Sequence, residues 1–325
     1  MAKSKLKKAS GYINYAVVAA VLIITSILGY GGYLDRSTMN LLTMISYSII
    51  LAVSLNLVVG FLGELSLGHA GFMCVGAYLG CFLAKYLNAV ISSKLVVLII
   101  SMIVGGLIAA VFGFLIGLPA LRLKGDYLAI VTLAFGEIVR NIFKNLKLFG
   151  GAKGLSTDKY GIELYIPALV VVLLMLFVLQ NLIRSKHGRA ITAIRDNEIA
   201  ARAMGINVTF YKLLVFVISA FFAGIAGVIY GHYNTPVMYT FFSYNYSIEI
   251  LVMVVLGGMG SVNGSIIAAT LITCINYFLQ TKLSGDLAAI KNLVYALILI
   301  VMIIFNNAPA LKGVRETLFG KKEAK

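Results

Sequence analysis

The stretch RSKHGRAITAIRDNEIAARAMGINVTFYK, from Arg184 to Lys212, is the longest polar interval in a chain that is otherwise almost continuously apolar. The interval is strongly basic, with Arg184, Lys186, Arg189, Arg195, Arg202 and Lys212 set against Asp196 and Glu198. Basic loops of membrane proteins stay on the cytoplasmic side. The interval therefore sets the expected orientation of the apolar segments before and after it.

Within this interval the residues predict a short helix with its own capping groups. Asp196 or Asn197 can cap its amino end, and Gly205 is placed to end it. Glu198 lies in the first turn, where the helix dipole favours a carboxylate. Its small apolar face is formed by Ile199, Ala200, Ala203 and Met204. A solvated loop does not need such a face, whereas a docking surface for a soluble partner does, so we expect another protein to bind this helix.

Over the whole chain of 325 residues, 61% are hydrophobic and only 12% are charged. Apolar runs of about twenty residues recur, and each is long enough to cross a bilayer as a helix. The composition predicts an all-α fold, a polytopic transmembrane helical bundle that forms one membrane domain over residues 1–325.

The net charge of +15 would suggest a nucleic-acid partner for a soluble chain. Here, however, the basic residues gather in the tail 1–11, in the interval 184–212 and in the tail 306–325. This is the positive-inside pattern, and it places both tails and the interval in the cytoplasm. We therefore expect membrane lipid around the chain and no binding of nucleic acid.

The apolar segments predict about ten membrane crossings, six before the basic interval and four after it. They are Tyr12–Tyr33, Met39–Phe61, Leu65–Tyr86, Lys94–Leu118, Tyr127–Leu146, Ile162–Ile183, Leu213–Tyr233, Tyr246–Leu256, Ile266–Leu283 and Leu287–Phe305. The fifth carries three charged residues and the eighth is short for a span. Six crossings return the chain to the side on which it began, which agrees with the charge of the interval.

Two glycine-rich interruptions fall at comparable places in the two halves, LGELSLGHAGFMCVGAY at Leu62–Tyr78 and VLGGMGSVNGSIIAAT at Val255–Thr270. Glycines in membrane helices can simply allow close packing of helices. As a pair, these interruptions also fit broken helices next to a transport pathway. His69, in the first interruption, could line a pore or be a packed or capping histidine. Both alternatives remain open from the residues alone.

Few ionisable residues lie within the apolar runs, and those few do not suggest an active site. Glu137 and Arg140 are three residues apart and can pair with each other, and Glu249 lies in the short eighth segment. A charge at membrane depth usually faces a partner or a wet cavity. The sequence has no phosphate-binding loop, no catalytic triad pattern and no cysteine–histidine cluster, so we expect neither enzymatic activity nor a cofactor or metal.

Several long stretches resemble the LivM-type permease subunits of branched-chain amino-acid ABC importers. The resemblance extends from about Gly60 to Phe305. It is carried by SLGHAGFMCVGAY (Ser66–Tyr78), LRLKGDYLAIVTLAFGEIVR (Leu121–Arg140), GRAITAIRDNEIAARAMGINVTFYKLLVFVISAFFAGIAG (Gly188–Gly227) and SIEILVMVVLGGMGS (Ser247–Ser261). The external GGAKGLSTD segment departs from the usual form of the family, which leaves the exact ligand more open.

The resemblance implies a role for each of the features above. The capped helix corresponds to the coupling helix that docks in a cleft of the ATPase, with an EAA-like pattern in which Ile199 displaces the strict spacing by one. The coupling residues implied are Asp196, Asn197, Glu198, Ala200, Ala201, Arg202 and Gly205. The residues implied to line or gate the pathway are Gly68, His69, Gly71, Glu137, Glu249, Gly257, Gly258 and Gly260.

The resemblance also implies an assembly and a location. The arrangement of crossings is that of type II importers, with broken or re-entrant helices. The implied partners are a LivH-type second permease, LivG- and LivF-type ATPase subunits that hydrolyse the ATP, and an external substrate-binding protein. The implied location is the bacterial inner or plasma membrane. Leucine, isoleucine and valine are the implied cargo. Urea, short amides or other amino acids are alternatives, as is a secondary carrier that acts alone.

Overall fold

The structure is a computed structural model that describes residues 35–123, 125–160 and 164–282, together with single residues within 18–28 and 296–300. The described residues form helices joined by short loops, and they contain no strand beyond one isolated bridge between Leu155 and Val237. The all-α fold class is thereby confirmed. Contacts within the chain divide it into two units at Thr270 and Leu271. The interactions described below lie within the first unit.

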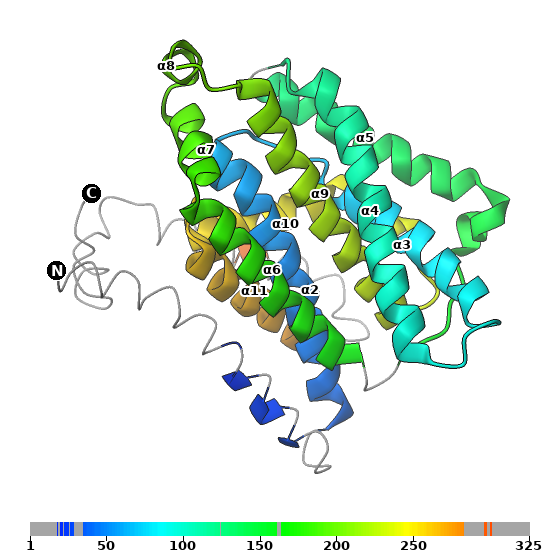
Figure 1. Cartoon of the computed structure of the whole chain (residues 1–325). Coiled ribbons are helices and arrows are strands. Elements are labelled where there is room, and N and C mark those ends of the chain that lie inside the picture. Colours follow the sequence, from blue (N-terminus) through cyan, green and yellow to red (C-terminus); the bar gives the residue numbers. More distant parts are fainter. Residues whose placement is uncertain are drawn as a thin grey trace. The chain divides into compact units, whose positions relative to one another are not determined.

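The longer helices follow one another along the chain with short connections (Figure 1). They are α2 (Arg36–Asn56), α3 (His69–Leu87), α4 (Lys94–Ala120), α5 (Asp126–Asn145), α6 (Tyr165–Arg184), α7 (Lys186–Asp196), α9 (Val208–Tyr233), α10 (Tyr244–Gly257) and α11 (Val262–Lys282). The shorter ones are the π-helix η1 (Leu57–Leu62), the 3₁₀ helices η2 (Lys147–Phe149), η3 (Gly151–Lys153) and η5 (Tyr239–Phe242), and the six-residue helix α8 (Glu198–Ala203).

Within the described part of the chain, six helices are long and apolar enough to cross a membrane. They are α2 continued by η1, α3, α4, α6, α9 and α11. Helices α5 and α10 match the two weakest predicted crossings, because α5 is interrupted by charged residues and α10 has only 14 residues. The predicted first crossing, Tyr12–Tyr33, lies almost entirely outside the described residues. The tenth, Leu287–Phe305, also lies outside them except for single residues, as do the two basic tails.

The predicted helix starts differ most from those in the structure at α3, α9 and α11, and α11 begins at Val262 rather than at Ile266. Helix α3 begins at His69 rather than at Leu65, since Gly63 has a φ of 81° and the chain up to Gly68 is not helical. Helix α9 begins at Val208 rather than at Leu213. The side chain of Asn207 accepts a hydrogen bond from the amide of Phe210 at 3.1 Å and so starts α9 inside the polar interval.

Helix α9 is the central element of the first unit and packs against α2, α3 and α4 (Figure 1). Glycines line its contact with α3 and α4. A Cβ on Gly227 would lie 2.0 Å from the carbonyl oxygen of Met73, and one on Gly76 would lie 2.2 Å from that of Gly224. Membrane helices gain van der Waals contact by this close approach of backbones, because lipid supplies no hydrophobic driving force between them.

Aromatic rings close the end of the unit where α9 finishes. Tyr78 stacks on Phe143 with ring centroids 4.5 Å apart, and Tyr230 stacks on Phe241 at 4.1 Å. The Tyr78 hydroxyl donates a hydrogen bond to the carbonyl of Val237 at 3.0 Å. These contacts join α3, α5 and α9 to the loop that leads into α10.

The GGAKGLSTD segment, residues 150–158, is held at this same end by hydrogen bonds. The amide of Leu155 donates to the carbonyl of Val237 at 3.1 Å, and the reverse bond is 2.9 Å. Asn88 donates to the carboxylate of Asp158 at 2.7 Å. Burial raises the pKa of the Tyr160 phenol, which lies beside this carboxylate. Three segments distant in sequence therefore form one surface at the end opposite α8.

The Gly227→Ala change tests the close packing of α9 on α3. The added methyl group would overlap the backbone of Met73, and overpacking of this kind costs about 1–3 kcal/mol. We expect a lower midpoint of thermal unfolding in detergent. Gly136→Ala is the control, because its nearest neighbour would be 3.7 Å away. Equal midpoints for the two variants would contradict the packing described here.

Candidate functional site

The basic interval forms two helices, where the sequence predicted one. The first, α7, is amphipathic and buries Ile191 and Ile194 against the membrane helices. Ser185 caps it, accepting hydrogen bonds from the amides of His187 and Gly188 at 3.1 and 3.3 Å. The sequence does contain a signal for α7, namely a serine cap followed by two isoleucines three residues apart. The prediction nevertheless placed no helix there.

The second helix, α8, is the predicted capped helix. Asn197 is its cap, because its side-chain oxygen accepts a hydrogen bond from the amide of Ala200 at 3.0 Å. Asp196, the other residue proposed for this role, instead ends α7 and accepts hydrogen bonds from Arg195 at 3.0 and 3.1 Å.

Gly205 ends α8 as predicted. It has a φ of 80°, its amide donates to the carbonyl of Arg202, and the amide of Ile206 donates to that of Ala201 at 3.1 Å. This pair of bonds is the Schellman motif, which satisfies carbonyls that a helix end would otherwise leave free. A helix of six residues is thus defined at both ends by its own sequence.

One face of α8 is exposed and apolar. The side chains of Ile199 and Met204 are 78% and 83% exposed, whereas Ala201 is turned inward and buried. The predicted apolar face therefore points away from the rest of the chain. Large exposed aliphatic side chains grouped on a short, well-capped helix are typical of a protein interaction surface.

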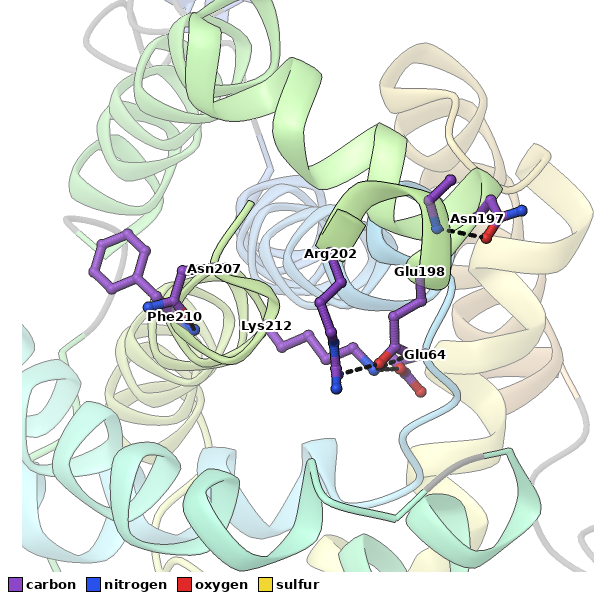
Figure 2. Close-up of polar contacts among 8 residues, drawn as sticks. Glu64, Asn197, Glu198, Arg202, Asn207, Phe210 and Lys212 are labelled. Atoms are coloured by element: carbon purple, nitrogen blue, oxygen red, sulfur yellow. Dashed lines mark hydrogen bonds and ion pairs between the residues drawn. The ribbon is translucent and has the colours of Figure 1, made fainter. Parts of the chain in front are cut away.

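A buried lysine attaches α8 to the membrane helices (Figure 2). Lys212, in the first turns of α9, has a side chain only 4% exposed. Its ammonium group forms ion pairs with Glu64, which follows η1, and with Glu198 of α8, the latter at 3.2 Å. Glu198 also pairs with Arg202 at 2.9 Å. Glu198, which the helix dipole was predicted to stabilise, thus also forms a tertiary ion pair with Lys212.

Arg195 attaches α7 to η1. Its guanidinium donates a hydrogen bond to the carbonyl of Gly60 at 3.1 Å. Its aliphatic part lies against Gly63, where a Cβ would be only 2.7 Å from the side chain. Neither Glu64 nor Arg195 was among the predicted site residues, because their partners are more than a hundred residues away in the sequence.

The second glycine-rich interruption is held against the end of α2, shortly before the first interruption begins. Asn56, completely buried at the end of α2, accepts a hydrogen bond from the amide of Gly260 at 2.9 Å. It donates to the carbonyl of Ser261 and to the hydroxyl of Ser265 at 3.0 and 2.9 Å. An uncharged amide inside an apolar helix is a signal that is visible in the sequence, but only ionisable residues and glycines were predicted to line the pathway.

The predicted gating glycines fall into two groups. Gly257 ends α10, and Gly258 and Gly260 lie in the turn between α10 and α11, with φ values of 89° and 79°. Gly68 and Gly71 instead pack on α5: a Cβ on Gly68 would lie 2.4 Å from the Thr132 carbonyl oxygen.

The polar residues predicted to lie near a pathway have different surroundings. His69 is buried and its Nε2 lies 2.9 Å from the hydroxyl of Ser54, which agrees with a packed histidine. Glu137 pairs with Arg140 and also accepts a hydrogen bond from the amide of Tyr244, the first residue of α10, at 3.1 Å. Glu249 is half-buried on α10. That these residues line or gate a pathway stays a prediction.

The protein family described as "Branched-chain amino acid transport system / permease component" matches residues 37–305. The chain belongs to this family. The resemblance to LivM-type permeases is thereby confirmed, and with the apolar helices it identifies a multi-pass membrane protein.

Two relatives are each 40% identical over 193 residues, which cover 49% of this chain and 45% of theirs. They are the high-affinity branched-chain amino acid transport system permease proteins LivM of Salmonella typhimurium and Escherichia coli. A probable LivM permease of Methanocaldococcus jannaschii is 30% identical over 159 residues, 45% of this chain and 46% of its own. The chain spans about half the length of these curated relatives.

A solved structure, PsaBC from Streptococcus pneumoniae in complex with Fab, aligns with 92% of this chain and 99% of that chain. The sequence identity is 14% and the TM-score is 0.45, a likeness that carries no argument.

The Lys212→Met change tests the buried ion pairs. It leaves Glu64 and Glu198 facing each other without their shared cation, and breaking a buried pair costs about 3–5 kcal/mol. We expect a decrease of about 3 kcal/mol in the free energy of unfolding, measured by denaturant titration in mixed micelles. Lys186→Met, on the exposed side of α7, is the control, and an equally small effect for both variants would disprove the structural role of Lys212.

Proposed function

We propose that the chain is the permease subunit of an ABC importer for branched-chain amino acids and forms half of the transport pathway. Membership of the family supports the transport role, and the names of the relatives support this cargo. The other half would be a second permease of the LivH type. The complex would lie in a bacterial inner or plasma membrane, with both termini on the side of α8.

The observation that carries the coupling role is the exposed apolar face of α8. Ile199 and Met204 have the exposure expected of side chains that enter a cleft in a soluble subunit. The proposed docking segment is Asp196, Asn197, Glu198, Ala200, Ala201, Arg202 and Gly205, together with these two residues. ATPase subunits of the LivG and LivF types would bind here and hydrolyse ATP, and this chain would respond by moving.

The transport pathway is proposed to pass between this chain and the second permease. Glu137 lies in a groove along the outer face of α5 with Ile138, Asn141 and Asn145, which offers polar groups among apolar ones. The proposed lining and gating residues are Gly68, His69, Gly71, Glu137, Glu249, Gly257, Gly258 and Gly260. A substrate-binding protein would deliver cargo to the opposite end, where the fastened loops meet.

Reconstitution tests the cargo directly. Proteoliposomes with this chain, the second permease, both ATPases and the binding protein are expected to take up leucine, isoleucine and valine only with ATP. Liposomes that lack this chain are the control. ATP-dependent uptake of urea or another amino acid instead would contradict the proposed cargo but support the importer. Uptake by this chain alone without ATP would contradict the importer and indicate a secondary carrier.

Changing Ile199 and Met204 to aspartate tests the docking surface. Two charges on an apolar contact are expected to weaken ATPase binding by about tenfold or more, since each tenfold loss corresponds to about 1.4 kcal/mol. Co-purification of the ATPases with the tagged chain measures this loss. Val90→Asp, exposed in the loop after α3, is the control. Retention of the ATPases by the double variant would disprove docking through α8.

A further inference from the structure

We propose that Arg195 and Asn56 form a relay that transmits movement of α7 and α8 to both glycine-rich interruptions, so that the two interruptions open and close as one gate. The proposal rests on the proposed function, because the movement originates in ATPase subunits docked on α8. It assigns a positioning role to Arg195, which lies within a family-like stretch but outside the implied coupling residues, and to Asn56, which precedes the region of resemblance.

The first step of the relay is the contact between Arg195 and Gly60. Arg195 is the penultimate residue of α7, directly before the segment that leads into α8. Its Nη1 donates to the Gly60 carbonyl at 3.1 Å, and a Cβ on Gly260 would lie 3.5 Å from the same Nη1. The guanidinium therefore lies where the chain before the first interruption meets the turn of the second.

The second step is the set of three hydrogen bonds made by Asn56. They connect the last residue of α2 to the turn before α11 through Gly260, Ser261 and Ser265, all at 2.9 or 3.0 Å. Asn56 has no exposed surface, so each lost bond would leave a buried polar group unpaired. The amide thus holds the second interruption against the end of α2, from which the chain runs through η1 into the first interruption.

The backbone that follows Asn56 and contains Gly60 is a wide π-helical turn, η1. In η1, a Cβ on Gly60 would overlap the side-chain oxygen of Asn56 at 1.9 Å and the amide of Gly260 at 2.1 Å. Only glycine allows this contact between backbones. π-helix is rare and its single turns frequently occur at functional sites.

Glycine hinges and the ion pairs of Lys212 are also part of the proposed relay. Gly63, Gly258 and Gly260 have positive φ values and flank the contact, so the backbone on both sides can rotate at low cost. Glu64, next to Gly63, is held by Lys212 together with Glu198 of α8. A shift of α7 and α8 must therefore displace residues 60–64, and Asn56 transmits that displacement to Gly260.

The experiment measures gate movement and transport separately in the assembled complex. Met259 is exposed in the second interruption, so Met259→Cys is introduced with Cys274→Ser, since Cys74 and Cys81 are buried. The rate of maleimide labelling at position 259 is compared with and without trapped ATP. We expect ATP to change this rate several-fold, within the roughly 5–150-fold range of coupled sites.

Arg195→Met is expected to remove the ATP-dependent change in labelling and to lower uptake per ATP hydrolysed by about tenfold, while the ATPases still co-purify. Arg189→Met, an exposed arginine on the same helix, is the matched control and should behave like the unchanged chain. Arg195→Lys keeps a cationic donor and should restore part of the response.

Two outcomes would overturn the relay. The first is an ATP-dependent labelling change in Arg195→Met as large as in Arg189→Met. The second is loss of the ATPases from Arg195→Met, because Arg195 would then belong to the docking surface. Labelling does not depend on the cargo, so a wrong cargo leaves this test intact, whereas failure of ATPases to bind the unchanged chain would reject the proposed function instead.

Ser265→Ala provides a second variant that removes one bond of Asn56 without disturbing its position. We expect a weakened labelling response with unchanged ATPase binding. Asn40→Ala, on the same α2 but at its other end, is the control. A full response in Ser265→Ala together with a full response in Asn56→Ala would also overturn the relay.

Discussion

Helix α9 approaches α3 and α4 so closely that its backbone touches theirs, and the positions of the remaining elements follow from this contact. Any side chain at Gly227 or Gly224 would separate the helices. With α9 held there, Lys212 at its beginning reaches Glu64 and Glu198, and Tyr230 near its end reaches the aromatic rings of the opposite surface. One helix therefore connects the end that carries α8 with the opposite end of the unit, and small changes in its packing would alter both.

Polar contacts across long sequence distances concentrate at the α8 end of an otherwise apolar unit. Lys212, Arg195 and Asn56 each join segments more than a hundred residues apart. Burying polar and charged side chains in a membrane protein costs free energy, and such side chains usually pair with other polar groups. Their common location beside η1 means that helices α7 and α8, the start of the first interruption and the turn of the second share one set of hydrogen bonds and ion pairs. The coupling proposed here uses that shared set.

Local features of the chain could be predicted from the sequence because they depend on near neighbours. The cap at Asn197, the end of α8 at Gly205 and the breaks around Gly63 and Gly258 all follow from residue types and spacing. The start of α9 was displaced by five residues because the cap at Asn207, and not the hydropathy, sets it. The start of α3 was displaced by four residues because the chain from Gly63 to Gly68 is not helical. Helix α7 was missed since its polar composition hid a face of two buried isoleucines.

By itself the sequence determined a multi-pass helical membrane protein, its family, the capped helix α8 and the two glycine-rich interruptions. Hydropathy, capping and turn chemistry act over a few residues, so they can be read along the chain. Only the tertiary structure decided that Asn56 meets Gly260, that Arg195 meets Gly60 and that Lys212 is buried between two carboxylates. The physical reason is that the packing of α9 on its neighbours brings together residues whose separation in sequence carries no information about their distance in space.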